Sequence, residues 1–225
     1  YQVTNDGEKR SQYQMLKDLM LTEEEFIILK RKSDEIGIEF LSTPYDSIAV
    51  NFLERLNIRV YKVASADIID PLLNRAIAST GKKVIISTGM SSIEEIGSCL
   101  EIYKNYNKKN ICLLHCVSNY PCNTEDLNLS LIEKLKKRYK CKIGYSGHET
   151  SVSPSLTAVA MGAEVVERHI TLNRTMWGTD HSASLEMNGM VQLVNLIRKY
   201  EKSYGDGIKK ITLNEKKKLK DMKYW

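Results

Sequence analysis

The sequence lacks the features that mark membrane proteins and disulfide-rich secreted proteins. None of its apolar runs approaches the roughly 20 residues that a membrane-spanning helix needs, and no signal-peptide pattern opens the chain. The five cysteines are an odd number and include no Cys-x-x-Cys pair. Cys112 and Cys116 fall inside an apolar run, where a thiol packs as a small hydrophobic group. We therefore expect no membrane partner, and free thiols in the reducing cytoplasm.

A strong charge spread over the chain is also missing, because the formal net charge of +5 arises at one end. Lysines crowd the last stretch, at Lys209, Lys210, Lys216, Lys217, Lys218, Lys220 and Lys223. Binding along a nucleic acid needs basic side chains spread over one folded face. We therefore interpret residues 208–225 as a solvated basic linker and expect no nucleic-acid partner.

Strand and helix patterns alternate through residues 1–207. Helix starts are predicted from capping and proline patterns, at Thr22-x-x-Glu25, Asp46, Pro71, Ser91-x-x-Glu94 and Ser153-Pro154. A last helix is expected from about residue 188 to 204. The β-rich runs that alternate with these helices lie at residues 38–41, 59–64, 84–86, 111–116, 142–145 and 164–170.

Six successive strand–helix units require a parallel sheet with right-handed crossovers. An open doubly wound sheet and a (β/α)₈ TIM barrel both meet this requirement. No glycine-rich phosphate-binding fingerprint follows any strand, which disfavours the nucleotide-binding open sheet. Polar residues instead follow every strand, at the ends where barrels assemble their active sites. Because the chain opens on Tyr1 rather than methionine, we expect an α/β TIM barrel that is truncated at its N-terminus and lacks two units.

His148 and His169 follow two consecutive predicted strands, so both imidazoles can face one barrel mouth. Two imidazoles make a sparse metal site that leaves positions open for water and substrate oxygens. The alternative is that each is a packed or surface histidine. Lys62 ends a strand between Tyr61 and Val63. Its ammonium group is a candidate Schiff-base nucleophile or phosphate clamp, or a lysine whose stem packs while its charge reaches water.

Small hydroxyl groups follow several strands, at Thr43, Ser65, Ser87 and Ser146. Their repetition around one rim suggests an oxygen-rich anion such as phosphate or carboxylate. His115 lies in the middle of an apolar strand, which favours core packing. Asp180 lies in the polar loop of residues 178–182, where it either forms a turn or contacts substrate.

Several ordered motifs carry a family resemblance over about residues 21–207. They are Tyr61-Lys62-Val63-Ala64-Ser65-Ala66-Asp67, Ile86-Ser87-Thr88-Gly89-Met90, Leu114-His115-Cys116-Val117-Ser118-Asn119-Tyr120-Pro121, Gly144-Tyr145-Ser146-Gly147-His148-Glu149-Thr150, Val166-Glu167-Arg168-His169-Ile170-Thr171-Leu172 and Gly178-Thr179-Asp180-His181-Ser182-Ala183-Ser184-Leu185. The chain resembles the N-acetylneuraminate (sialic acid) synthase family, and its Gly-His-Glu sequence resembles the animal-like branch. The 21-position separation of His148 and His169 matches that of the two metal-binding histidines in this family.

The resemblance implies a (β/α)₈ barrel that condenses phosphoenolpyruvate with N-acetylmannosamine, its 6-phosphate or a related amino sugar. It implies a divalent ion, Mn²⁺ foremost with Mg²⁺ or Co²⁺ as alternatives, held by His148 and His169. Lys62 would be catalytic as a phosphate clamp. The residues implied to bind phosphoenolpyruvate are Thr43, Lys62, Ser65, Ser87, Ser118 and Ser146, and those implied to face the sugar are Asp67, Tyr120 and Asp180. The resemblance also implies a cytoplasmic homodimer.

The sequence departs from the family pattern at both ends and at two internal positions. Many bacterial members have Asn where this chain has Ser118, and Asp where it has Gly147. The family's first two strands, which supply a glutamate and a further lysine, are not in this sequence. Nor is the antifreeze-like domain that would follow residues 208–225. Two other functions stay open: a Schiff-base aldolase or lyase that uses Lys62, and a non-catalytic truncated barrel.

Overall fold

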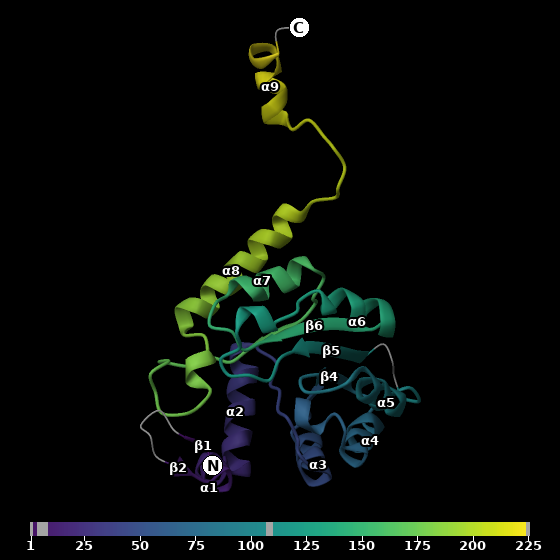
Figure 1. Cartoon of the computed structure of the whole chain (residues 1–225), viewed down its shortest axis with the longest axis vertical. Coiled ribbons are helices and arrows are strands. Elements are labelled where there is room, and N and C mark those ends of the chain that lie inside the picture. Colours follow the sequence, from purple (N-terminus) through teal and green to yellow (C-terminus); the bar gives the residue numbers. More distant parts are fainter. Residues whose placement is uncertain (1, 4–8, 107–109, 224–225) are drawn as a thin grey trace.

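A computed structural model describes residues 2–3, 9–106 and 110–223 of the chain. Its centre is a parallel sheet whose strands follow one another in chain order, with a helix after each strand (Figure 1). The strands are β3 (Val60–Val63), β4 (Lys83–Ser87), β5 (Ile111–Cys116), β6 (Lys142–Gly147) and β7 (Val166–Arg168). The helices that follow them are α4 (Pro71–Ser79), α5 (Ile93–Tyr103), α6 (Leu131–Tyr139), α7 (Ser153–Ala160) and α8 (Met187–Tyr204).

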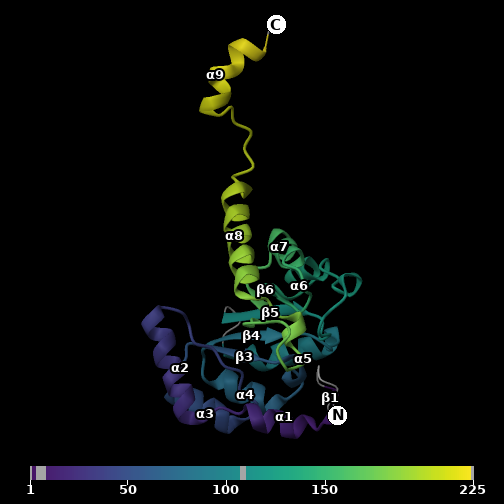
Figure 2. The same cartoon turned by 90° about the vertical axis from the view of Figure 1, so that its left-hand side faces the viewer.

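The remaining elements lie before and after this unit. An antiparallel pair, β1 (Gln2–Val3) and β2 (Lys9–Arg10), is followed by α1 (Gln12–Leu19), α2 (Glu23–Ile36) and α3 (Ser47–Arg55). At the other end α9 (Leu213–Met222) stands away from the body of the molecule, as Figure 2 shows. The predicted basic linker therefore contains a helix, and its residues 208–218 and 221–223 are exposed.

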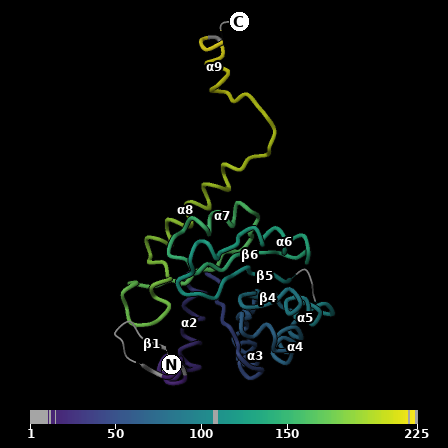
Figure 3. Tube along the Cα trace, in the orientation of Figure 1, coloured from purple at the N-terminus to yellow at the C-terminus, as the bar shows by residue number. Residues whose placement is uncertain are grey.

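The sheet is a half-barrel with two different faces, because successive side chains in a strand point to opposite sides. One face carries apolar residues such as Tyr61, Ile86 and Leu113, which pack in one core with residues of α3 to α7. The other face carries Lys62, Ser87, Cys116, Ser146 and Glu167 at the alternate positions. Strand register places the last three side by side, because Cys116 pairs with Ser146 and Ser146 pairs with Glu167. The trace in Figure 3 shows β4, β5 and β6 with the helices α5, α6 and α7 that follow them.

The prediction of a strand at residues 38–41 is wrong, so the described sheet has five strands rather than six. Side chains rather than a backbone ladder hold this segment. Phe40 packs against the core and meets the Phe26 ring edge-on, with centroids 6.4 Å apart. Glu39 forms an ion pair with Arg59, directly before β3. The strands β3 and β7 are therefore the two edges of the described sheet, and the complete barrel stays a prediction.

Most predicted helix starts are confirmed. The Thr22 hydroxyl and the Glu25 carboxylate form a reciprocal capping box at α2, and the Asp46 side chain accepts from the Ala49 amide at α3. The capping box of α5 lies one position later than predicted, with Ser92 and Glu95 as its partners. Pro71 and Pro154 lie in the first turns of α4 and α7, as predicted.

Three further predictions concern the cysteines, the helices and His115. All five cysteines are free, and burial raises the pKa of the Cys99 and Cys112 thiols to about 12. Within the described ranges, no helix is both long enough and apolar enough to cross a membrane. His115 is buried, and its Nε2 lies 2.7 Å from the Leu127 carbonyl, which confirms its predicted place in the core.

Candidate active site

A cavity of about 600 Å³ opens at the carboxyl ends of the parallel strands. It contains every residue proposed above as a site residue except two, Asp67 and Asp180. The side chains and backbone that line it belong to Thr43, Tyr45, Lys62, Ala64, Ser65, Ala66, Ser87, Met90, Cys116, Ser118, Tyr120, Ser146, His148, Glu167 and His169. Strand ends from β3 to β7 thus converge on one concave surface.

The two predicted metal-binding histidines face each other in this cavity. Their ring centroids are 5.4 Å apart with the planes at 77°, and the Tyr120 ring lies 4.1 Å from that of His148. The His148 Nδ1 lies 2.7 Å from the Val117 carbonyl oxygen. A carbonyl only accepts, so Nδ1 carries the proton and Nε2 keeps a free lone pair. The Nδ1 atom of His169 lies 3.6 Å from the Asp180 carboxylate, farther than a hydrogen bond reaches.

Burial lowers the pKa of His148; its contact with the Val117 carbonyl raises that pKa and the neighbouring His169 lowers it further. Desolvation has the largest effect on the pKa of His148, so the neutral imidazole is favoured. The neutral ring with its second nitrogen donating to a carbonyl is the arrangement that metal-binding histidines adopt. The chemistry of His148 and His169 therefore fits a divalent transition-metal ion.

The protein offers such an ion few ligands. In the part of the chain that the structure describes, no group of three or more histidine, cysteine, aspartate or glutamate side chains is arranged to hold a metal. Two imidazoles match an ion whose other positions are filled by water and by substrate oxygens, as the sequence predicts. The identity of the ion stays a prediction.

Lys62 lies at the other side of the same cavity. Its Nζ donates to the Ser87 hydroxyl at 2.8 Å and to the Val63 carbonyl at 3.1 Å, and lies 3.6 Å from the Glu167 carboxylate. Three oxygen contacts match the three donors of an ammonium group. The Lys62 side chain is 14% exposed, so its charge faces the cavity rather than bulk water.

Glu167 joins the lysine to the histidines, and the sequence analysis did not propose it as a site residue. Its carboxylate accepts from the Ser146 hydroxyl at 2.8 Å, and that hydroxyl lies 3.5 Å from the His148 Nε2. A charged residue inside a β-rich run, two positions before a histidine, is the pattern that would have revealed it. The period of two in a strand places Glu167 and His169 on one face.

Two residues predicted to face the sugar lie outside the cavity lining. Asp67 ends the short helix η1 (Ser65–Asp67), and burial together with the charge of Asp70 raises its pKa, against the lowering effect of Lys62. Its Oδ2 is buried and has no hydrogen-bond partner among the described residues. Asp180 lies at the rim, beside His169. Their contact with a sugar stays a prediction.

The loop after β4 presses against three small side chains of the cavity. The Gly89 amide donates to the Ser65 hydroxyl at 3.0 Å, and this hydroxyl lies 3.3 Å from the Cys116 thiol. A Cβ atom at Gly89 would lie 2.2 Å from the Ser118 Oγ and 2.9 Å from both Ser65 Oγ and Cys116 Sγ. Only glycine therefore lets this loop lie against the hydroxyl groups at its present position.

We expect Gly89→Ala to displace Ser65 and Ser118 and to weaken anion binding. Loss of one hydrogen bond to a charged group costs about 1.5–3 kcal/mol, which corresponds to roughly a 10- to 150-fold higher dissociation constant for inorganic phosphate. Isothermal titration calorimetry with phosphate measures the change. The matched control is Gly97→Ala in α5, where the added Cβ meets nothing within 4 Å. Equal phosphate affinity in the two variants would contradict the role of these hydroxyls.

Comparison with known proteins places the chain in a family. The sequence profile of the NeuB family matches residues 1–209. The N,N'-diacetyllegionaminic acid synthase of Campylobacter jejuni is 39% identical over 221 residues, which are 97% of this chain and 66% of that protein. The human N-acetylneuraminate-9-phosphate synthase is 40% identical over 195 residues, which are 86% of this chain and 54% of that protein.

Solved structures agree with these sequence relatives. The sialic acid synthetase of Leptospira borgpetersenii matches with a TM-score of 0.81 and 37% identity, over 89% of this chain and 70% of that one. A truncated 3-deoxy-D-arabino-heptulosonate 7-phosphate synthase of Thermotoga maritima, with a TM-score of 0.72 and 18% identity over 82% of this chain and 74% of that one, shares the fold. This chain spans between about half and two thirds of the length of the curated relatives that it matches. The chain belongs to the NeuB family.

Proposed function

We propose that this chain carries the catalytic half-barrel of a nonulosonic acid synthase. The enzyme would condense phosphoenolpyruvate with N-acetylmannosamine, its 6-phosphate or a related N-acylated amino sugar, and release phosphate. The observation that carries the proposal is the shared cavity, which places a lysine and several hydroxyls beside a facing pair of imidazoles. Two relatives are named as synthases of legionaminic acid and of N-acetylneuraminate 9-phosphate, and these names support the same reaction.

The lysine side of the cavity suits the anionic substrate. Phosphoenolpyruvate carries a phosphate and a carboxylate, and both are oxygen-rich acceptors for donor groups. The Lys62 ammonium and the Ser87 hydroxyl already lie 2.8 Å apart, so both can donate to one anionic group. Ser65 and Ser118 lie across the cavity against Gly89 and add further hydroxyls. Charge-assisted hydrogen bonds of this kind are stronger than neutral ones, and they orient the substrate.

The histidine side of the cavity suits the aldehyde. A divalent ion bound there would polarise a carbonyl oxygen as a Lewis acid. His148 and His169 would hold this ion, with the Val117 carbonyl orienting the His148 ring and the Asp180 carboxylate 3.6 Å from the His169 Nδ1. Glu167 would keep the Ser146 hydroxyl oriented between the two sides and balance the charge of Lys62. Tyr120 covers both imidazoles, and burial raises the pKa of its phenol to about 12, which keeps the group neutral.

The proposed reaction needs no reactant beyond phosphoenolpyruvate, the aldehyde sugar and water. The C3 carbon of phosphoenolpyruvate forms a bond to the aldehyde carbon, and the oxygen of a water molecule forms a bond to C2. One proton of that water ends on the aldehyde oxygen, which becomes a hydroxyl, and the other leaves with the phosphate. The bond between C2 and the bridging oxygen breaks, so that C2 becomes a carbonyl carbon and inorganic phosphate leaves. The protein would orient the two substrates at a distance that permits the new bond and exclude competing hydrolysis.

We further propose that the five described strands belong to a (β/α)₈ barrel, since both sheet edges, β3 and β7, offer unpaired backbone groups. The solved relatives that share the fold are longer than this chain, which supports additional strands. The homodimer, the choice of Mn²⁺ and the cytoplasmic location stay predictions of the resemblance.

Substrate turnover tests the proposed function. The protein is incubated with Mn²⁺, phosphoenolpyruvate and one of several aldehyde sugars, and released phosphate is measured. We expect release with at least one N-acylated amino sugar, such as N-acetylmannosamine or its 6-phosphate, and none with erythrose 4-phosphate. Phosphate release that needs no amino sugar, or that follows only erythrose 4-phosphate, would contradict the proposal.

A further inference from the structure

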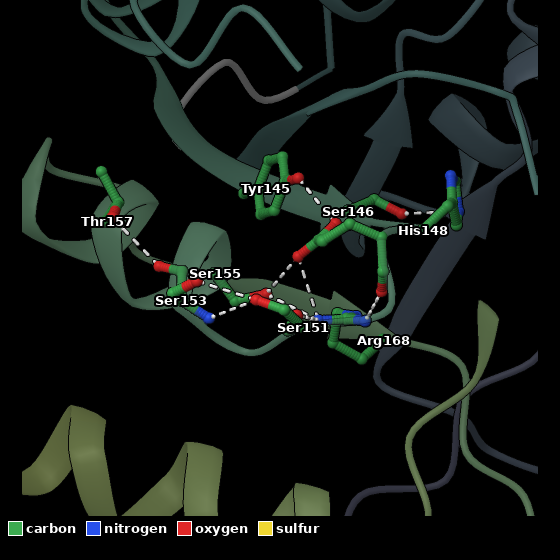
Figure 4. A network of polar contacts seen from close by, with 9 residues as sticks. Tyr145, Ser146, His148, Ser151, Ser153, Ser155, Thr157 and Arg168 are labelled. Atoms are coloured by element: carbon green, nitrogen blue, oxygen red, sulfur yellow. Dashed lines mark hydrogen bonds and ion pairs between the residues drawn. The ribbon is translucent and has the colours of Figure 1, made fainter. Parts of the chain in front are cut away.

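A buried ion pair links the ends of β6 and β7 directly behind the two imidazoles. Glu149 follows His148 in the chain, and Arg168 precedes His169. The Arg168 Nη1 lies 3.0 Å from the Glu149 Oε1, and the two side chains are only 1% and 4% exposed. Figure 4 shows Arg168 within the polar network that joins the end of β6 to the first turn of α7.

The pair is embedded in further hydrogen bonds. Glu149 accepts from the Tyr145 hydroxyl at 2.9 Å and from the Ser155 hydroxyl at 3.2 Å. Arg168 donates to the Ser151 carbonyl at 2.9 Å and also to the backbone carbonyl of Glu149. The guanidinium therefore binds the carboxylate and the backbone of one residue together. This arrangement fixes the course of the chain immediately after His148.

Stability alone is a poor explanation for such a pair. Removing two charges from water is costly, and well-packed apolar residues often replace a buried ion pair without loss of stability. The guanidinium is also not fully satisfied, because the Arg168 Nε is buried without a hydrogen-bond partner among the described residues. The contacts of Arg168 with the Ser151 and Glu149 backbone carbonyls point instead to a requirement for position.

The strand geometry shows which position it sets. Glu149 and Arg168 contact Ser155 of α7 on the outer side of the sheet, whereas His148 and His169, their neighbours in the chain, line the cavity. Gly147 and Arg168 are the last paired residues of β6 and β7, so the ion pair lies where the pairing of these two strands ends. The His169 side chain is 37% exposed, and its Nδ1 lies 3.6 Å from the Asp180 carboxylate, which is too far for a hydrogen bond. The place of this ring beside His148 therefore follows from its backbone, which Arg168 holds directly before it and the Leu185 amide binds at the His169 carbonyl.

We propose that Glu149 and Arg168 form a positioning pair that sets the separation of the His148 and His169 imidazoles, and through it the affinity of the site for a divalent cation. This inference rests on the proposed function, because it takes the imidazole pair as the cation site. Neither residue of the pair touches the ion or the substrate. Their effect passes through the two strand ends.

The test titrates Mn²⁺ as its chloride into the metal-free protein and follows free Mn²⁺ by electron paramagnetic resonance. Arg168→Met is expected to weaken Mn²⁺ binding about 10- to 100-fold, the range found for groups that orient metal ligands. Arg168→Lys keeps one charge but loses the fork of donors, so we expect an intermediate loss. Arg198→Met removes an exposed ion pair with Glu201 on α8 and should leave the affinity unchanged.

A double variant separates positioning from stability. Glu149→Leu combined with Arg168→Met leaves no unpaired buried charge, so its thermal unfolding should return close to that of the parent protein. We expect its Mn²⁺ affinity to stay at least tenfold weaker than that of the parent. Parent-like affinity in the stable double variant, or in Arg168→Met, overturns the positioning role. Failure of the parent protein to bind Mn²⁺ instead overturns the cation site of the proposed function, so the two failures are distinguishable.

Discussion

Replacing His169 with alanine is expected to abolish metal-dependent turnover. The cavity offers a divalent ion two facing imidazoles, and in the described residues no third side chain completes a group that would hold the ion without His169. The loss of one of two ligands should weaken Mn²⁺ binding more than the 10- to 100-fold found when only an orienting group is removed. Phosphate release at saturating substrates and Mn²⁺ titration by electron paramagnetic resonance give two independent measurements.

The matched control is His181→Ala. His181 lies in the loop after β7, where its Nδ1 contacts the Thr171 hydroxyl at 2.7 Å, and it does not line the cavity. We expect the His181→Ala variant to bind Mn²⁺ with an affinity within about twofold of that of the parent protein. This change is smaller than a tenfold change in affinity, which corresponds to about 1.4 kcal/mol. Full turnover of the His169→Ala variant, or turnover that strong chelation does not affect, would show that the imidazole pair is not the metal site.

Lys62→Met is expected to raise the KM for phosphoenolpyruvate by about 10- to 150-fold, because a hydrogen bond to a charged group contributes about 1.5–3 kcal/mol. Methionine keeps the stem but removes the ammonium that contacts Ser87 and Glu167. The KM for the amino sugar should change much less, since that substrate is assigned to the histidine side. Lys62→Arg keeps the charge with a different donor geometry and should retain partial activity.

The same variants test the Schiff-base alternative. An imine mechanism needs a free amine, so both Lys62→Met and Lys62→Arg would be inactive, and borohydride would trap a covalent adduct in the parent protein. The Lys62 Nζ donates to the Ser87 hydroxyl and the Val63 carbonyl and lies 3.6 Å from the Glu167 carboxylate, so it is held by oxygen groups rather than directed freely into the cavity. Lys82→Met is the control, because Lys82 pairs with Glu54 at 2.8 Å and lies outside the cavity. A normal KM for phosphoenolpyruvate in Lys62→Met would contradict the phosphate clamp.

Local sequence patterns predicted the elements well where local interactions decide them. The Thr22 and Asp46 caps depend on contacts within one turn, and both are present. The α5 cap was misplaced by one residue because Ser91 and Ser92 are both followed by a glutamate three positions later, and only the loop geometry decides between them. The segment at residues 38–41 has strand-like composition, but ladder formation depends on a neighbouring strand that local sequence does not reveal.

The candidate site was predictable to the extent that it follows strand ends. Lys62, Ser65, Ser87, Ser146, His148 and His169 lie at or within two residues of strand ends, and the cavity contains them. Thr43 also lines the cavity, although the strand predicted before it does not form. Glu167 was missed because its role depends on contacts with Lys62 and Ser146 from other strands. Tyr45 and Met90 were missed because they lie in loops, where side-chain direction follows from the folded backbone, as the positive φ of 58° at Met90 illustrates.

We propose that the protein joins phosphoenolpyruvate to an amino-sugar aldehyde and cleaves the bond between C2 and the bridging oxygen. Phosphoenolpyruvate labelled with ¹⁸O at the oxygen that bridges C2 and phosphorus tests it most directly. The protein, Mn²⁺ and an accepted amino sugar are added, and the isotope shift of the released phosphate is measured by ³¹P nuclear magnetic resonance. We predict that the label leaves with inorganic phosphate and that release requires the amino sugar. Label retained in the organic product, or phosphate release without the sugar, would contradict the account.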